Sequence, residues 1–255
     1  MSELDVRTFT VGPVQENCYI VRSGGDAQHG VIVDPGEEPE RLIQAARTLG
    51  VSLDAILITH CHFDHIGAVA PLARATGAPV YCPEVERGIL ADVMRWVPAG
   101  FGPFASYQAD HTVAGGERLT LAGLEIEVIF TPGHSPGHVT YAISAAPPGG
   151  AAAGPDESST GGTAGTDRPV ARALLSGDVL FQGSVGRTDL PGADWATLER
   201  SIGTLLEAFP AETLVYPGHM GITTLGRERA TNPFLDEFRA APQAVPAPRA
   251  APAGS

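Results

Sequence analysis

The chain combines 255 residues, 43% of them hydrophobic and 18% charged, with a formal net charge of −13, so it can bury a sizeable core and is not a highly charged disordered polymer. Sixteen Lys and Arg residues against 29 Asp and Glu residues would repel DNA or RNA. No apolar run approaches the ~20 residues that a bilayer-spanning helix needs. We therefore expect a soluble globular protein with neither a nucleic-acid nor a membrane partner.

Short runs rich in β-branched residues predict strands along most of the chain. In chain order they are residues 6–11, 18–21, 31–33, 55–59, 80–82, 124–130, 139–144, 173–176 and 213–216. Helical patterns lie between them at residues 38–49, 66–75, 85–96 and 195–209. The last pattern follows Asp194, a residue type favoured at helix N-caps. Strands mixed with covering helices predict a layered α/β domain.

Two segments have the composition of structureless chain, and they set the expected domain bounds. Residues 145–167 and 240–255 are rich in Ala, Gly and Pro and have almost no apolar bulk, so their burial would not offset the entropy of ordering them. The first segment separates two predicted strands, and long insertions at loop tips cost little closure entropy. We expect one domain over residues 1–239 with an insertion at 145–167, followed by a disordered tail at 240–255.

The N-terminus and the cysteines indicate the expected compartment. Residues 1–5 have neither the basic start nor the apolar stretch of a secretory signal, which favours a cytoplasmic protein. Cys18, Cys61 and Cys82 are odd in number and widely spaced, which does not resemble a disulfide framework. We expect three reduced thiols.

Three of the eight histidines of the chain fall within six residues, in the sequence HCHFDH. The segment follows a predicted strand, so His60 and His62, two residues apart, can point the same way. Asp64 and His65 follow in the turn and can face a second, adjacent point. Cys61 should turn away from that point into the packing, where a small thiol fits.

Three further candidate ligands each follow a glycine at the end of a predicted strand. They are His134, Asp178 and His219. Such turns place side chains at the rim of a sheet, where several loops can converge on one site. So many titratable groups in such positions are hard to explain as core packing, because each would need a buried partner. Imidazoles and carboxylates together suit Zn, Fe or Mn, so the sequence predicts a metal site.

This constellation resembles the metallo-β-lactamase superfamily, whose HxHxDH motif is matched at residues 60–65. The resemblance continues in the order of the family through residues 131–137, 176–178 and 217–219, and so covers nearly the whole domain. It implies the four-layer αβ/βα sandwich of that superfamily, with the site at one edge of two facing sheets. It also implies two divalent metal ions, for which we favour zinc over iron or manganese.

Carried over position by position, the resemblance assigns seven ligands. One ion would be held by His60, His62 and His134 and the other by Asp64, His65 and His219, with Asp178 as the bridge. Asp64 and Asp178 would take part in catalysis.

Two other residues near these motifs are interpreted from their sequence neighbours. Asp34, after the strand predicted at 31–33, can accept a proton from a ligating histidine and fix its tautomer, with a turn cap as the alternative. His138 is interpreted as a local hydrogen-bond partner and not as a ligand.

Within the superfamily, residues 9–19, 183–189 and 231–235 resemble the short bacterial members among glyoxalase II-type hydrolases. That likeness implies hydrolysis of a thioester such as S-lactoylglutathione or a related acyl-thiol. Two metal ions lower the pKa of a bridging water, so that hydroxide is available near neutral pH as the nucleophile. A thiolate leaving group, whose parent thiol has a pKa of ~8.5, needs no general acid.

The glutathione contacts of the family are matched only in part. Arg187 stands at a basic glutathione contact of the family, but Asp189 and Gly221 stand where the family has tyrosines that bind glutathione. Only residues 220–255 follow His219, so the helical C-terminal domain of full-length glyoxalase II enzymes is not expected.

Other functions are compatible with the same ligands. A persulfide dioxygenase would hold a single iron with His60, His134 and Asp178, and oxygen uptake would identify it. A hydrolase of another ester, a lactone or a phosphoester would use all seven ligands, as would a metal-binding module without catalysis. The missing secretory signal disfavours a secreted β-lactamase. The oligomeric state is not predicted by these patterns.

Overall fold

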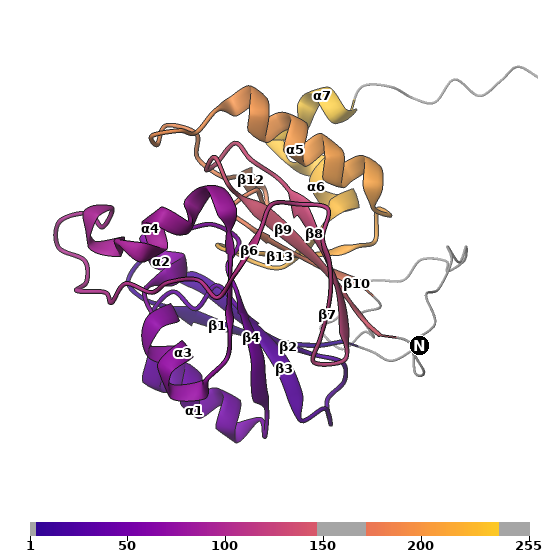
Figure 1. Cartoon of the computed structure of the whole chain (residues 1–255). Coiled ribbons are helices and arrows are strands. Elements are labelled where there is room, and N and C mark those ends of the chain that lie inside the picture. The colour runs from indigo at the N-terminus through magenta and orange to yellow at the C-terminus, as the bar shows by residue number, and fades with distance from the viewer. Residues whose placement is uncertain (1–3, 147–171, 240–255) are drawn as a thin grey trace, which may run out of the picture.

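Two six-stranded sheets form the centre of the computed structural model, which describes residues 4–146 and 172–239 (Figure 1). The strands of the first sheet follow chain order: β1 (Asp5–Val11), β2 (Glu16–Arg22), β3 (His29–Val33), β4 (Ser52–Leu57), β5 (Val80–Pro83) and β6 (His111–Val113). The second sheet has the order β14 (Thr223–Thr224), β13 (Leu214–Pro217), β10 (Arg172–Gly177), β9 (Val139–Ala145), β8 (Leu124–Phe130) and β7 (Arg118–Leu121). A small ribbon joins β11 (Leu180–Phe181) to β12 (Ser184–Val185).

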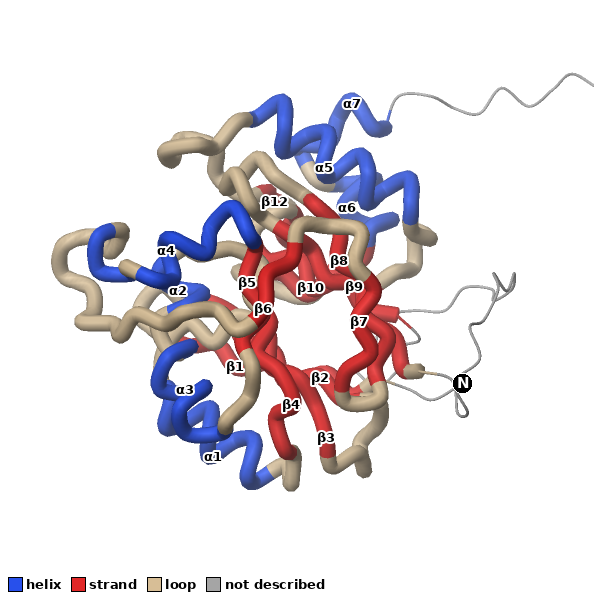
Figure 2. Tube along the Cα trace, viewed as in Figure 1, coloured by secondary structure: helices blue, strands red, loops and turns tan. Residues whose placement is uncertain are grey.

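Helices lie on opposite sides of this pair of sheets (Figure 2). Those that follow strands of the first sheet are α1 (Pro39–Thr48), α2 (Phe63–Ile66), α3 (Val69–Thr76) and α4 (Arg87–Ala91), with the 3-10 turns η1 (Glu84–Glu86) and η2 (Val93–Arg95). Those of the second half are α5 (Trp195–Ala208), α6 (Leu225–Thr231), η3 (Pro233–Leu235) and α7 (Asp236–Arg239).

Three buried apolar clusters fill the spaces between the layers. The central cluster, with the fully buried Tyr141, contains side chains from both sheets. A second cluster packs Leu42 of α1 against Ile56 of β4, and a third packs Ile202 of α5 against Leu174 of β10. Alternate residues of β4 face two different clusters, because Ala55 and Leu57 belong to the central cluster and Ile56 to the second. The order of layers is helix, sheet, sheet, helix, which confirms the predicted αβ/βα sandwich.

Parallel strand pairs bring the loops of the site together. In the first sheet β3 and β4 are parallel, with Val33 beside Leu57. In the second sheet β10 and β13 are parallel, with Leu175 beside Tyr216. The carboxyl ends of parallel neighbours lie at the same edge of a sheet, and ligands bind in the crevice outside such ends in open α/β sheets. The segments that carry six of the seven candidate ligands follow β4, β10 and β13, while His134 follows β8, which has only antiparallel neighbours.

Two predicted helices differ from those observed. The pattern at 66–75 is divided between α2 and α3, with Gly67 and Ala68 between them. The continuous helix predicted at 85–96 is wrong, because the chain forms η1, α4 and η2, with a non-helical Asp92 (φ −143°, ψ 57°) as the break. The first of these turns contains Glu86, whose buried carboxylate accepts three hydrogen bonds.

The predicted domain bounds lie partly outside the described residues. Ala145 and Ala146 are placed, but residues 147–167 of the predicted insertion and the whole predicted tail at 240–255 are not among them. The single domain over residues 1–239 therefore stays a prediction. Among the described residues, no helix combines the length and the apolar character needed to cross a bilayer.

Candidate metal centre

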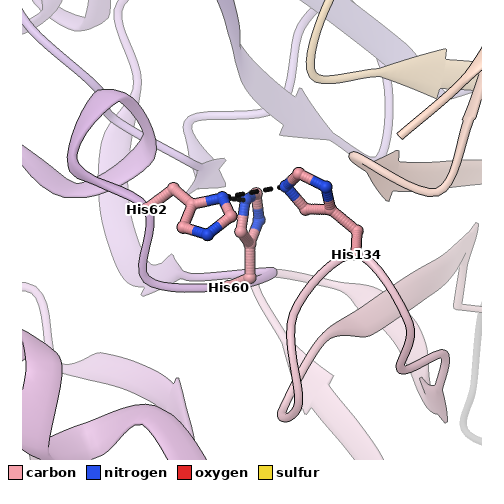
Figure 3. Close-up of side chains that lie close together, drawn as sticks. All are labelled: His60, His62 and His134. Atoms are coloured by element: carbon pink, nitrogen blue, oxygen red, sulfur yellow. Dashed lines mark hydrogen bonds between the residues drawn. The ribbon is translucent and has the colours of Figure 1, made fainter. Parts of the chain in front are cut away.

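Three histidines meet in a first pocket, which we call the three-histidine pocket. His60 and His62 follow β4, and His134 comes from the loop after β8 (Figure 3). The His62 Nδ1 atom lies 3.1 Å from His60 Nε2 and 2.8 Å from His134 Nε2. Two ligands at 2.0–2.1 Å from a tetrahedral zinc ion lie roughly 3.3 Å apart, which is close to these spacings. The pocket therefore presents three nitrogens to one point.

Burial keeps the His60 and His62 imidazoles neutral. The pKa of His62 falls to about 4, because burial disfavours the charged ring and the neighbouring His134 adds to that effect. Burial likewise holds the pKa of His60 well below its usual value, with smaller contributions from the other histidines. A neutral imidazole is the form that ligates a metal, so neither His60 nor His62 has to lose a proton before an ion binds.

A second pocket, the carboxylate pocket, contains Asp64, His65 and His219. The Asp64 Oδ2 atom lies 3.3 Å from His219 Nε2 and 3.9 Å from His65 Nε2. One donor atom from each of the three residues lies within 4.8 Å of the others. Short helix α2 supplies the first two residues, while the third follows β13 in the opposite sheet. The pocket therefore depends on both halves of the sandwich.

Asp178 lies between the two pockets. Its Oδ1 atom is 3.4 Å from His65 Nε2, and its Oδ2 atom is 3.5 Å from His134 Nε2 and 3.6 Å from His219 Nε2. One carboxylate thus approaches a histidine of each pocket. The structure brings all seven predicted ligands into this cluster, and their role as ligands stays a prediction.

The donor atoms around Asp178 fit a divalent cation. His65 Nε2 and Asp178 Oδ1 are buried and lack a hydrogen-bond partner within the described part of the chain, although buried polar atoms almost always have one. Gly218 lines the same space, since a Cβ there would lie 2.3 Å from Asp178 Oδ1. Both orphaned atoms are good metal ligands, so a cation among them would satisfy each.

The negative charges of Asp64 and Asp178 also favour a cation in the carboxylate pocket. Burial opposes a charge on His65, but Asp178 and Asp64 outweigh burial and raise the pKa of this histidine well above its usual value. Burial favours the neutral acid at Asp178, but His65 opposes it more strongly and the pKa of Asp178 falls far below its usual range. A proton on His65 thus balances the carboxylates, and a bound ion would replace that proton.

Asp34 sits behind both pockets and is almost fully buried. Its Oδ1 atom accepts from the Thr59 N–H (2.7 Å), and its Oδ2 atom accepts from the Thr59 hydroxyl (2.6 Å) and from His65 Nδ1 (3.0 Å). The same hydroxyl is 3.1 Å from His60 Nδ1 and can accept its proton. The network assigns Nδ1–H to both histidines and directs each Nε2 atom at the pockets, so the proton that a bound ion would replace on His65 is the one on Nε2.

The loops that carry His134 and His219 are held by backbone carbonyls. His134 Nδ1 donates to the Arg187 carbonyl oxygen at 2.9 Å. Asn17 donates its backbone N–H to the carbonyl of Gly218 (2.7 Å) and its side-chain amide to those of Pro217 (3.2 Å) and Met220 (2.9 Å). Asn17 therefore binds the peptide units on either side of His219. Asn17 lies in the segment 9–19, but no local pattern in the sequence indicates these contacts.

His138 is placed as a hydrogen-bond partner and not as a ligand. Its Nδ1 atom is 3.1 Å from the Thr131 hydroxyl, and its Nε2 atom accepts from the Asp178 N–H at 3.1 Å. Gly177 precedes Asp178 at a φ of 46°, and a Cβ there would lie 2.7 Å from His138 Nε2. Only glycine fits that left-handed, crowded position without strain.

Several other residues were considered in the sequence. Cys18, Cys61 and Cys82 are free and buried, as expected, and Cys61 packs in the core with its Sγ 3.5 Å from Cys82 Sγ. Arg187 is exposed, and its guanidinium donates to both carboxylate oxygens of Asp189 at 2.6 and 2.7 Å. Its expected substrate-binding role stays a prediction, and an anionic substrate would have to share Arg187 with Asp189.

Comparison with known proteins identifies the family of the chain. Residues 11–146 match the metallo-beta-lactamase superfamily. The chain belongs to this superfamily. It is 36% identical over 239 residues to the probable metallo-hydrolase YqgX of Bacillus subtilis, with 91% of this chain and 98% of that protein covered. It is 32% identical over 236 residues to the hydroxyacylglutathione hydrolase GloC of Haemophilus influenzae, with 91% and 99% covered.

Solved structures agree with this placement. The crystal structure of BLEG-1, a B3 metallo-beta-lactamase, is 35% identical, has a TM-score of 0.75, and covers 91% of this chain and 100% of its own. The crystal structure of TTHA1623 in a di-iron-bound form is 39% identical, has a TM-score of 0.64, and covers 90% and 100%. The chain is therefore a metallo-hydrolase of a superfamily that binds divalent metals.

Proposed function

We propose that the chain hydrolyses an acyl-thiol thioester of the S-lactoylglutathione type, with one divalent ion in the three-histidine pocket and one in the carboxylate pocket. The position of Asp178 carries this proposal, because a single carboxylate approaches histidines of both pockets. The likeness to GloC over nearly the full length of both chains supports the substrate class. The likeness to TTHA1623, which was crystallised in a di-iron-bound form, supports two ions.

The chemistry divides between the ions and the chain. Divalent ions in these pockets would supply Lewis acidity, which brings the pKa of a water near neutrality and polarises a carbonyl group. Asp34 holds His60, through Thr59, and His65 with their Nε2 atoms toward the pockets. Asp178 stays ionised at neutral pH, because its pKa is held low against the effect of burial. It therefore adds negative charge where two cations would lie.

A thiolate leaving group does not require a general acid from the chain. A thiol has a pKa of ~8.5, so a departing thiolate is a weak base and needs no protonation in the transition state. Asp64 also remains a carboxylate, because His65 and His219 lower its pKa more than burial raises it. A carboxylate is a ligand and a proton acceptor but not a general acid. A site with two ionised aspartates therefore suits a thioester better than a substrate with a strongly basic leaving group.

Thiol release from S-lactoylglutathione tests the proposal. The full chain, stripped of metal and reloaded separately with zinc, manganese and iron(II), is expected to release thiol, whereas the stripped protein is not. A panel of acyl-thiols with other thiol parts would report how far the thiol is recognised. A protein that holds two ions per chain and releases thiol from no member of the panel would overturn the proposal.

A second candidate is β-lactam hydrolysis, which the 35% identity to BLEG-1 favours. A β-lactam also presents a carbonyl to a hydroxide, but its leaving group is an amine nitrogen, which is far more basic than a thiolate. A chromogenic β-lactam measured beside S-lactoylglutathione separates the two activities. A much larger kcat/KM on the β-lactam would assign this second function.

A further inference from the structure

Glu86 is a buried carboxylate at the end of η1 that accepts three hydrogen bonds. Its Oε2 atom accepts from the Cys61 N–H at 2.5 Å. Its Oε1 atom accepts from the Ser135 hydroxyl at 2.5 Å and from the Gly137 N–H at 2.8 Å. The approach is close, since a Cβ on Gly137 would lie 2.7 Å from Glu86 Cγ.

The donors to Glu86 belong to the two loops that form the three-histidine pocket. Cys61 lies between His60 and His62, and Ser135 directly follows His134. These loops come from different sheets, since the first follows β4 and the second follows β8. The carboxylate of Glu86 joins the two loops through hydrogen bonds to Cys61 and Ser135. The nitrogens of the neighbouring histidines meet in the pocket (Figure 3).

We propose that Glu86 is a positioning residue that sets the distance between the two histidine loops, so that the three-histidine pocket is formed before an ion enters. The inference rests on the proposed metal-dependent function and extends it to a residue outside the pockets. Glu86 reaches the histidines only through the backbone and side chain of their neighbours. A preformed pocket binds more tightly because the ion does not have to order the loops.

A second buried glutamate provides a matched control. Glu228 is fully buried and accepts from the Gly183 N–H (2.7 Å), the Thr223 hydroxyl (2.5 Å) and the Asn232 amide (2.9 Å). It thus also has a backbone amide, a hydroxyl and a third N–H donor. None of its donors is adjacent in sequence to a candidate ligand. Loss of either carboxylate should loosen the fold, but only loss of Glu86 should loosen the three-histidine pocket.

The test measures zinc affinity by competition with a chelating dye, one pocket at a time. His219→Ala leaves the three-histidine pocket intact, and His62→Ala leaves the carboxylate pocket intact. Glu86→Gln replaces one acceptor oxygen with an amide NH2 group, which cannot accept from the donor that it faces. In the His219→Ala background it is expected to weaken zinc binding about 10–100-fold, the usual effect of losing an outer contact of a metal ligand. In the His62→Ala background the expected change is below about 3-fold.

Two further variants keep the result interpretable. Ser135→Ala removes one donor and leaves the carboxylate, and we expect a loss of about 10-fold in the His219→Ala background, the lower end of the same range. Glu228→Gln is expected to lower the thermal midpoint as Glu86→Gln does, with zinc affinity unchanged in both backgrounds. Circular dichroism before each titration shows whether a variant is folded. If Glu86→Gln does not fold, Ser135→Ala tests the positioning role by itself.

The outcomes separate this inference from the proposed function. Equal zinc affinity with and without the Glu86 and Ser135 changes would overturn the positioning role, as would an equal loss in both backgrounds. A selective loss in the three-histidine pocket together with no thioester hydrolysis would support the positioning role and refute the proposed substrate class. A wild-type protein that takes up no zinc, manganese or iron would overturn both.

Discussion

The most informative single substitution is Asp34→Asn, because it changes one atom behind both pockets. Asparagine matches the size of aspartate and tolerates the φ of 49° at this position. Its Oδ1 atom can still accept from the Thr59 N–H. Its amide, however, would face the Thr59 hydroxyl and His65 Nδ1, which both donate to Oδ2 in the native chain. His65 would then have to turn its lone pair toward the introduced amide and its proton toward the carboxylate pocket.

The size of the effect follows from the hydrogen bond that is lost. A hydrogen bond to a buried charged group is worth about 1.5–3 kcal/mol, and about 1.4 kcal/mol corresponds to tenfold in affinity. Zinc binding in the carboxylate pocket should therefore weaken about 10–100-fold, which agrees with the usual effect of removing a carboxylate partner of a ligating histidine. Competition with a chelating dye in the His62→Ala background measures this loss.

The matched control is Asp54→Asn. Asp54 also accepts from a histidine Nδ1, that of His29 at 2.8 Å, but this pair is exposed and outside both pockets. We expect its zinc affinity to equal that of the wild type. Unchanged zinc affinity in Asp34→Asn would refute the argument that Asp34 fixes the tautomer of His65.

Three further predictions follow from the same contacts. Asp178→Ala should reduce bound metal from two ions per chain to one or fewer and abolish turnover, and elemental analysis showing two ions with full turnover would contradict the bridging role. Asn17→Ala removes two amide hydrogen bonds beside His219, each worth about 1 kcal/mol. Zinc affinity in the carboxylate pocket should therefore fall at least about tenfold. The same dye competition should show an unchanged affinity in the three-histidine pocket. Because the pKa of His65 is raised, this histidine carries a proton that zinc must displace, so affinity should rise with pH and calorimetry in buffers of different ionisation enthalpy should show proton release. Heats that do not depend on the buffer would show that His65 is already neutral.

The sequence predicts those parts of the fold that have a local signal. The alternation at residues 124–130 matches the bounds of β8, and α5 begins after Asp194, whose side chain accepts from the Thr197 N–H. The HxHxDH segment also has a local signal, because a period of two at the end of a strand followed by a turn separates two groups of side chains. The segment itself therefore predicts two groups of side chains, whereas the assignment of His134, Asp178 and His219 to them comes from the resemblance to the superfamily.

The supporting contacts could not be predicted in this way, because they join residues far apart in the chain. Asn17 binds a carbonyl 200 residues away, and Glu86 binds donors 25 and 49 residues away in Cys61 and Ser135. The wrong helix at 85–96 has a separate cause. The chain is helical from Glu84 to Ala91 and breaks at Asp92, which the amphipathic pattern of the segment does not reveal.

The most direct test of the central claim is thioesterase activity as a function of metal ions added per chain. Metal-free protein is titrated with zinc while thiol release from S-lactoylglutathione and oxygen uptake on a persulfide are followed. If Asp178 joins two working pockets, thiol release should rise mainly with the second equivalent and reach a plateau at two ions per chain. Full activity at one equivalent would contradict a two-ion site. Oxygen uptake by the protein loaded with a single iron, without thiol release, would contradict hydrolysis and identify a dioxygenase.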